Sequence, residues 1–279
     1  MSNFFYKEQT SCALTLIAIC FLGMSDSSPA VVFGDGNIEN GIEDQRRMAP
    51  HNLLSFSGTI HCGGRLRGSG SHIQLPTEYS SKMKSIILTA AHIFYHPTTG
   101  AAYSDCSYRP QGKRLSNIAI DHIWQHNYDP LMSDSMKQAD NDVVFAALKT
   151  DLSSRGVKLQ TIGHETQPLM LVGYNEKEQN ISLSDGCHQF ESRQFDSDNL
   201  LFHDCDADSG ASGGAIIDPL SGALVAIHGG TLLLEDTSSE LVGIRANAEV
   251  IINQGRKVDG ELLDQLRQFI AYLATDFPD

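Results

Sequence analysis

Residues 205–228 read CDADSGASGGAIIDPLSGALVAIH, and this stretch already indicates a β-protein. It contains two short apolar runs, Gly213–Ile217 and Ala223–His228, whose β-branched residues favour extended backbone. Asp, Pro, Ser and Gly separate the runs, and these residues favour a turn. Because each run is too short for a stable helix, the stretch predicts two strands joined by a turn, behind a glycine-rich bend.

The same pattern recurs along the chain from Leu54 onward. The other predicted strands are Leu54–Cys62, Ser85–Ala90, Asn117–Trp124, Val143–Leu148, Val157–Ile162, Pro168–Tyr174, Ile181–Phe190, Asn199–His203 and Leu241–Ala246. Many strands without intervening helices predict an all-β sandwich or barrel. The exception is Asp259–Thr275, where apolar residues recur at helical spacing and predict an amphipathic C-terminal helix packed on the core.

The composition limits the fold and the function. The chain has 279 residues, 41% of them hydrophobic, which fits one large domain or two small ones and excludes a disordered chain. A formal net charge of −14 argues against nucleic acid as the main ligand, because binding phosphates needs clustered Lys and Arg. The 24 Gly and 9 Pro follow no period, which excludes collagen-like sequence and fits a fold with many turns.

The N-terminal residues have the pattern of an export signal. The apolar run at 12–24 has 13 residues, whereas a membrane span needs about 20. Lys7 precedes the run and the small residues Ser28–Ala30 follow it. The pattern predicts a signal peptide over residues 1–30, and therefore a secreted or periplasmic protein without a membrane span. The alternative interpretation is a buried strand or helix of the mature protein.

Residues 31–50 are polar and irregular. They are either an ordered N-terminal arm or a pro-segment that is removed. Arg46-Arg47 within them is either a dibasic site for a processing protease or a solvated pair of side chains.

Cysteine usage agrees with export. Cys12 and Cys20 would leave with the signal peptide. The four remaining cysteines are Cys62, Cys106, Cys187 and Cys205. An even number fits disulfides in an oxidising compartment, with three pairings open; free buried thiols are the alternative. The sequence contains no CxxC motif that would indicate a metal site. It does not exclude a structural calcium ion.

Three segments carry residues that could take part in catalysis. They are Ile87–His92, a strand that runs into a histidine; Asn141–Leu148, an aspartate at the mouth of an apolar strand; and Cys205–Ile216, a serine in a glycine-rich bend. Taken singly, each has a plain structural alternative: a core histidine, a strand-end cap or a flexible turn. Together, and in the order His, Asp, Ser, they predict a catalytic triad.

Ser212 is the candidate nucleophile. A serine hydroxyl is a poor nucleophile at neutral pH and needs a base to take its proton. Gly210 lets the backbone turn sharply, and Gly213 and Gly214 let a substrate approach closely. The N–H groups of Gly210 and Ser212 could then converge on the oxyanion of an acyl-transfer intermediate.

His92 is the candidate base, because an imidazole titrates near neutral pH and a carboxylate can hold its tautomer. Asp142 is the candidate carboxylate, since it leads directly into an apolar strand. Asp140 competes for this role, but Asn141 rather than an apolar run follows it.

These motifs resemble those of the chymotrypsin-like (trypsin-like) serine peptidases. Leu88–His92 is similar to the family's histidine motif, Cys62-Gly63-Gly64 to the strand that precedes it, and Gly210–Gly214 to the nucleophile motif GxSGG. The likeness covers residues 50–275. It implies two packed six-stranded antiparallel β-barrels with the site between them, a C-terminal helix and no cofactor.

The resemblance also implies domain boundaries and roles. After the arm, residues 51–150 would form the barrel with the histidine and the aspartate, 151–257 the barrel with the serine, and 258–279 the helix. His92 would be the general base, Asp142 its orienter and Ser212 the nucleophile. The oxyanion hole would be the N–H groups of Gly210 and Ser212.

Two departures from animal trypsin-like enzymes stand out. Ala211 replaces the Asp that pairs with the N-terminus freed on activation, so that switch is expected to be absent. Ile93 replaces the Cys that follows the catalytic His. Against this family background we predict the disulfides Cys62–Cys106 and Cys187–Cys205. These details, with Val31–Asp35 and Ala226–Gly230, resemble the bacterial glutamyl-endopeptidase branch.

The residues that would set specificity disagree. By motif position His228, Ser209 and Thr231 resemble the set that binds a Glu side chain in the glutamyl-specific branch. Asp206, however, lies where trypsins hold the acid that binds Arg or Lys, and it would repel Glu if it faced the pocket. Plain wall packing is the alternative for each residue. Gly229, Gly230 and Thr231 are expected to pair with the substrate backbone.

The sequence therefore predicts a secreted serine endopeptidase, acting on peptides or proteins through an acyl-enzyme, with a preference for acidic residues. Two alternatives stay open: a catalytically silent binding or adhesion module on the same scaffold, and an esterase with the same triad. We expect no nucleic-acid partner, and a monomer.

Overall fold

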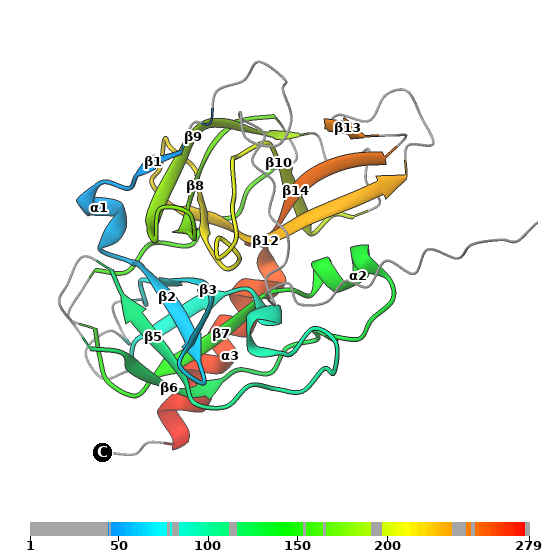
Figure 1. Ribbon diagram of the computed structural model, residues 1–279. Coiled ribbons are helices and arrows are strands. Elements are labelled where there is room, and N and C mark those ends of the chain that lie inside the picture. The colour runs from blue at the N-terminus through cyan, green and yellow to red at the C-terminus, as the bar shows by residue number, and fades with distance from the viewer. Residues whose placement is uncertain are drawn as a thin grey trace, which may run out of the picture.

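The computed structural model describes residues 44, 46–76, 79, 84–111, 116–152, 155–163, 166–190, 197–235, 244–246 and 249–276 (Figure 1). The predicted signal peptide and the Val31–Asp35 motif lie outside the described residues. The described chain forms two β-units, the first below and the second above in Figure 1, with one long C-terminal helix.

The first unit is a closed barrel of six antiparallel strands. In order of pairing, they are β2 (Ser57–Cys62), β3 (Arg65–His72), β4 (Ile86–Thr89), β7 (Val144–Leu148), β6 (Ile118–Ile123) and β5 (Cys106–Pro110). Since β5 pairs back onto β2, each of these strands has two neighbours. The interior is filled by fully buried apolar side chains such as Ile60, Leu88 and Tyr108.

The second unit is an eight-stranded sheet in which six strands form a ring. In order of pairing, the ring is β8 (Pro168–Asn175), β9 (Asn180–Phe190), β10 (Leu200–His203), β14 (Glu249–Lys257), β12 (Leu224–Glu235) and β11 (Ala215–Ile217), which pairs back onto β8. Two short strands join its outside: β1 (Arg46–Met48) pairs with β9, and β13 (Ile244–Ala246) pairs with β14. The predicted all-β fold with two six-stranded antiparallel units is confirmed.

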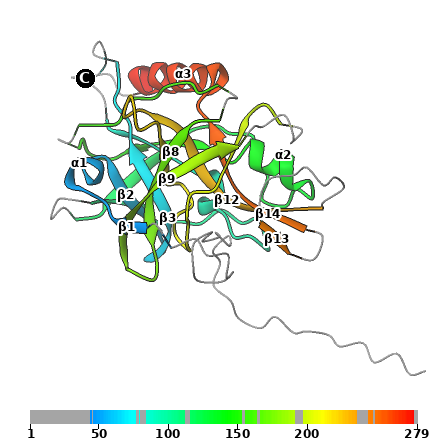
Figure 2. The same ribbon diagram turned by 90° about the horizontal axis from the view of Figure 1, so that it is seen from above.

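Helices are short except at the C-terminus. They are α1 (His51–Leu54), the 3-10 turn η1 (Ala91–Phe94), α2 (Ser135–Asp140) and α3 (Gly260–Asp276). Helix α3 follows the last strand of the second unit but packs on the first barrel, where Phe269 stacks on Trp124, just after β6, with ring centroids 5.0 Å apart. Figure 2 shows α3 along one edge of the molecule. The predicted amphipathic helix is thus confirmed. None of the described helices is both long and apolar enough to cross a membrane.

Some sequence predictions differ from the structure. Val157–Ile162 is not a strand: Val157 forms one isolated bridge with Ile73, and Leu159 forms one with Leu224. This segment instead connects the two units, with backbone hydrogen bonds to His72 and Gln74 on one side and to Leu224 on the other. Cys62-Gly63-Gly64 is not the strand that leads to the histidine motif either. Cys62 ends β2, and both glycines adopt positive φ in the turn to β3.

Both predicted disulfides are present. Cys62 is bonded to Cys106, which joins the end of β2 to the start of β5. Cys187 of β9 is bonded to Cys205, two residues beyond the end of β10. The second bridge lies next to the segment that leads to Ser212, so it fixes the entry to the glycine-rich bend.

Candidate active site

His92 and Asp142 meet at one end of the first barrel. His92 lies in η1 just after β4, and Asp142 lies just before β7; the two strands pair, with Thr89 opposite Val144. The His92 ring nitrogen Nδ1 lies 2.6 Å from Asp142 Oδ2, and the His92 backbone N–H donates to Oδ1 at 2.8 Å. Both carboxylate oxygens therefore hold the same residue.

The electrostatics of the pair give each ring nitrogen a defined state. Burial by itself lowers the pKa of His92, but the negative charge of Asp142 and its hydrogen bond outweigh this and raise the pKa above its ordinary value. Because a carboxylate only accepts hydrogen bonds, Nδ1 carries the proton. In the neutral imidazole this leaves the lone pair of Nε2 free to accept a proton from another group.

The bend that carries Ser212 packs against the same end of the first barrel. The Ser69 N–H of β3 donates to the Ser212 carbonyl at 2.7 Å. A Cβ added at Gly213 would lie 2.2 Å from Thr89 Oγ1, three residues before His92. A Cβ added at Gly68 would lie 2.6 Å from the Ser212 carbonyl and 2.9 Å from the Ile93 side chain. The absence of side chains here permits this close approach.

The three predicted triad residues thus come from segments that touch. Among the described residues, the Ser212 hydroxyl and the His92 ring form no hydrogen bond with each other. Such contacts are often long in enzymes without substrate and tighten when substrate binds. The described geometry joins the histidine to the aspartate directly and brings the serine beside them through its backbone.

Gly210 adopts the backbone conformation that the predicted oxyanion hole needs. Its φ of 90° belongs to the left-handed region, and an added Cβ would lie 2.6 Å from the ring of Tyr174. The turn is closed by the Ala211 N–H, which donates to the Asp208 carbonyl at 2.9 Å. Within the described part of the chain, neither the Gly210 N–H nor the Ser212 N–H donates to a protein acceptor. Both amides are therefore available to a ligand.

Two buried histidines lie behind the bend. His228 of β12 exchanges backbone hydrogen bonds with it: the Gly213 N–H donates to the His228 carbonyl at 2.8 Å, and the His228 N–H donates to the Gly214 carbonyl at 2.9 Å. His228 Nδ1 lies 3.3 Å from Nε2 of His203. His203 was missed in the sequence, since a histidine ending a short apolar strand carries no signal of its own.

The histidine pair is neutral and has a defined direction. Burial, with the positive charge of His92 adding to it, lowers the pKa of His228 to about 3. Burial and the neighbouring His228 lower the pKa of His203 well below its ordinary value. The Cys205 N–H donates to His203 Nδ1 at 3.2 Å, so the proton of His203 sits on Nε2, whose acceptors are His228 Nδ1 at 3.3 Å and the backbone of Gln254. When His203 donates to His228 Nδ1, the proton of His228 sits on Nε2.

One ring nitrogen of this pair lacks a partner among the described residues. His228 Nε2 is buried and, within the described residues, has no hydrogen-bond partner. A buried donor without a partner costs about 1–3 kcal/mol, so it is expected where a ligand supplies the acceptor.

The other predicted pocket residues differ in their hydrogen bonds and in their burial. Thr231 donates its hydroxyl proton to Asn253 Oδ1 at 2.6 Å, so it has no proton left for a ligand. Asp206 is buried, and burial, with a smaller contribution from the nearby Asp206, raises the pKa of Asp204. The Ser209 N–H donates to the Asp208 carboxylate at 2.7 Å, and the side chain of Gln254 packs over Gly229.

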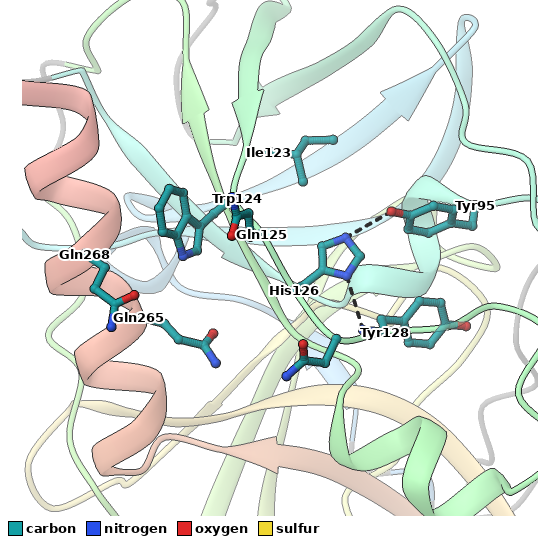
Figure 3. Close-up of a pocket in the computed structure, with 9 residues that line it drawn as sticks. Tyr95, Ile123, Trp124, Gln125, His126, Tyr128, Gln265 and Gln268 are labelled. Carbon is teal, nitrogen blue, oxygen red and sulfur yellow. Dashed lines mark hydrogen bonds between the residues drawn. The ribbon is translucent and has the colours of Figure 1, made fainter. Parts of the chain in front are cut away.

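A separate groove of 660 Å³ lies between α3 and the segment after β6 (Figure 3). Its lining residues are Tyr95, Ile123, Trp124, Gln125, His126, Asn127, Tyr128, Gln265 and Gln268. Within this groove, His126 Nε2 and the Tyr95 hydroxyl share a hydrogen bond of 3.0 Å. Burial, with the charge of Asp142 adding to it, raises the pKa of Tyr128, so this groove backs onto the candidate carboxylate but includes neither Ser212 nor His228.

No metal site emerges from the histidines. His92 and His96, like His122 and His126, are four residues apart in the chain. Even so, no three His, Cys, Asp or Glu side chains in the described ranges gather into a group that could hold an ion.

Comparison with known proteins agrees with this geometry. Residues 70–227 match the trypsin-like peptidase domain family. The match spans more than half of the chain, and the chain belongs to this family. Family and fold together assign it to the serine-type endopeptidases, whose substrates are peptides or proteins. No curated protein matches the chain.

Solved structures share the fold at low identity. A Glu endopeptidase in complex with MPD is 15% identical, with 82% of this chain and 98% of that chain covered and a TM-score of 0.57. Neuropsin, a serine protease expressed in mouse brain, is 15% identical, with 81% and 98% covered and a TM-score of 0.55. A human heparin binding protein mutant is 14% identical, with 84% and 97% covered and a TM-score of 0.53.

Proposed function

We propose that the chain is a secreted serine endopeptidase with the triad His92, Asp142 and Ser212, and that it prefers an acidic residue before the scissile bond. The observation that carries the proposal is the double hydrogen bond of Asp142 to His92 beside the bend that bears Ser212. A carboxylate that fixes both the backbone and the ring of a histidine orients that histidine as a base.

The proposed mechanism follows from these groups. Ser212 Oγ attacks the scissile carbonyl while His92 Nε2 takes its proton, and Asp142 stabilises the imidazolium that forms. The carbonyl oxygen gains negative charge and accepts hydrogen bonds from the free amides of Gly210 and Ser212. His92 then gives its proton to the leaving amine, and water hydrolyses the acyl-enzyme through the same steps in reverse.

Strand β12 offers an unpaired edge to which the substrate backbone could bind. From Gly230 onward, β12 pairs with β14 on one side, and Gly229 lies in a register shift of that pairing, while the pairing of β12 with β11 ends at Ile227. No other strand in the described part of the chain takes that second side. Addition of an extended peptide at Gly229–Thr231 would supply the missing ladder next to Ser212, as the sequence led us to expect.

The proposed acid preference rests on His228 Nε2. Its N–H is buried, lacks a partner among the described residues and is held in one tautomer by His203. A substrate carboxylate would accept from it a charge-assisted hydrogen bond. Thr231 would act only through Asn253.

Two rival functions differ from this in measurable ways. A silent binding module would share the fold, and the heparin binding protein among the similar structures is named for binding rather than for hydrolysis. An esterase would use the same triad on another substrate. The direct test is Ser212→Ala, which should abolish peptide hydrolysis and labelling by a fluorophosphonate probe.

The control for that test is Ser221→Ala. Ser221 lies exposed in the turn between β11 and β12 and should keep full activity. Hydrolysis by the Ser212→Ala protein would refute the proposal. A wild-type protein that ignores the probe would favour the binding module, and one that cleaves esters but no peptides would favour the esterase.

We also propose export and a monomer. The two disulfides fit an oxidising compartment, and the proposed signal peptide is residues 1–30. The proposed domain boundaries are residues 51–150 for the first barrel, 151–257 for the second and 258–279 for the C-terminal helix. N-terminal sequencing of protein recovered outside the producing cell would give the cleavage position, and sedimentation would give the oligomeric state.

A further inference from the structure

The dibasic pair Arg46-Arg47 has no part in the function proposed so far, yet its two side chains differ sharply. Both lie in β1, which pairs antiparallel with β9 and sets Arg46 opposite Ser184. The side chain of Arg47 is 61% exposed and forms a surface ion pair with Asp185. The side chain of Arg46 is only 7% exposed. A solvated pair would expose both guanidinium groups.

Arg46 joins the N-terminal arm to the bend before Ser212. Its Nε and Nη2 donate to the two carboxylate oxygens of Asp44, at 2.9 and 2.7 Å. Its buried Nη1 forms an ion pair with Oδ2 of Asp208 at 3.3 Å, without the geometry of a hydrogen bond. One guanidinium thus pairs with an acid two residues before it and with an acid that is distant in the sequence.

Asp208 in turn accepts hydrogen bonds from the N–H groups of the two residues that flank Gly210. Its Oδ1 accepts from the Ser209 N–H at 2.7 Å, and its backbone carbonyl accepts from the Ala211 N–H at 2.9 Å. Gly210 between them has a φ of 90° and offers its amide to the proposed oxyanion. The direction of that amide depends on this turn.

A second link runs from the same strand pair to the same bend. Ser184, the ladder partner of Arg46, accepts a hydrogen bond from the Asp206 N–H on its Oγ at 3.0 Å. Ala211 is apolar and buried, so it cannot form an ion pair that would hold the turn from inside.

Resting on the proposed function, we propose that Arg46 is a positioning residue for the oxyanion hole: it holds Asp208, and through Asp208 it sets the direction of the Gly210 amide. Asp44 and β1 are then part of the working enzyme. Cleavage at the dibasic pair would cut this link, so the active form retains Arg46.

The kinetic test compares Arg46→Ala with Arg47→Ala, a matched change one residue away on the same strand. Arg46→Ala should lower kcat for a peptide substrate about 10-fold to 100-fold with little change in KM, below the loss from removing an oxyanion donor outright. Arg47→Ala should keep kcat. Asp208→Asn retains an oxygen for the Ser209 N–H but loses the charge, so it should match Arg46→Ala. The double variant should be no worse than either.

A second measurement does not depend on activity. Amide hydrogen exchange of residues 206–214 should be faster in Arg46→Ala and Asp208→Asn than in wild type or Arg47→Ala, and Arg46→Lys should restore part of the protection. Equal kcat and equal exchange in Arg46→Ala and Arg47→Ala would overturn the inference. A wild type that hydrolyses nothing would refute the proposed function instead, and exchange alone would then decide whether Arg46 holds the bend.

Discussion

The two β-units hold their histidines in opposite states. On the first barrel, His92 faces the carboxylate of Asp142, and its pKa is raised. On the second unit, His228 faces the neutral ring of His203, and its pKa is lowered to about 3. Burial pushes both pKa values down, so the difference comes from the partner. A charged partner makes a histidine a base, and a neutral partner makes it a fixed donor.

Removing the charge on the first side should have the largest effect. Asp142→Asn should lower kcat about 10⁴-fold at neutral pH, because an amide can hold His92 in the wrong tautomer. Steady-state hydrolysis of a peptide substrate measures this. Asp140→Asn is the matched control, since Asp140 bonds to Ser197 and not to His92. A large loss in Asp140→Asn with none in Asp142→Asn would reverse the assignment.

Filling the space at Gly210 tests the donors of the second side. Gly210→Ala should lower kcat about 100-fold to 1,000-fold, because the methyl group meets Tyr174 and strains the amide away from the oxyanion. Gly222→Ala is the control, since Gly222 also has positive φ but open space around it. It should lower the melting temperature without changing kcat. Equal kinetics in the two variants would remove Gly210 from the oxyanion hole.

His228 should decide the preference for charge. Wild type should cleave after Glu with a kcat/KM about 10-fold to 100-fold above that after Gln, the range of a hydrogen bond to a charged group. His228→Phe should lose this ratio, and His203→Phe should weaken it by freeing the tautomer. Competition between matched peptides gives the ratios. A preference for Lys would contradict the assignment and favour Asp206 as the pocket acid.

The smallest expected effects are on pH dependence, where the two histidines should act with opposite sign. The kcat/KM should rise with pH as His92 loses its proton, with a midpoint above the ordinary pKa of histidine. Asp142→Asn should lower that midpoint. The stabilising pairing of protonated His92 is complete below about pH 6.5 and is lost as pH rises through the raised pKa.

Between about pH 6.5 and pH 3, His228 stays neutral in the folded protein but binds a proton in the unfolded chain. Stability should therefore fall as pH drops from about 6.5 towards 3. Urea unfolding of wild type and His228→Phe at several pH values would separate this contribution. A variant whose stability falls as steeply as wild type in acid would contradict the lowered pKa.

Local patterns were enough to predict much of this molecule. The strands around His92 and Asp142 are apolar runs, and the bend at Ser212 has glycines where the backbone needs positive φ. By contrast, β3 reads RLRGSGSH and was missed, because Gly68 must be small to lie against the Ser212 carbonyl and therefore weakens the strand pattern.

The contacts missed in the sequence are long-range ones. The pairing of His203 with His228 spans 25 residues, and Arg46 meets Asp208 across most of the chain. Each side chain is ordinary in its own segment and gains a role only through its partner. Such pairs depend on how strands pack, which spacing and composition do not encode.

The segment at 155–163 is a strap between the halves. The Val157 carbonyl accepts from the Gln74 N–H at 2.7 Å beside the first barrel, and the Lys158 carbonyl accepts from the Leu224 N–H at 2.8 Å on the second unit. Held by both, the segment fixes the spacing of the two units that carry His92 and Ser212. Under the proposed function a polypeptide binds along β12 as a single extended strand, so intact folded proteins should be cut only at loops or tails that can uncoil locally.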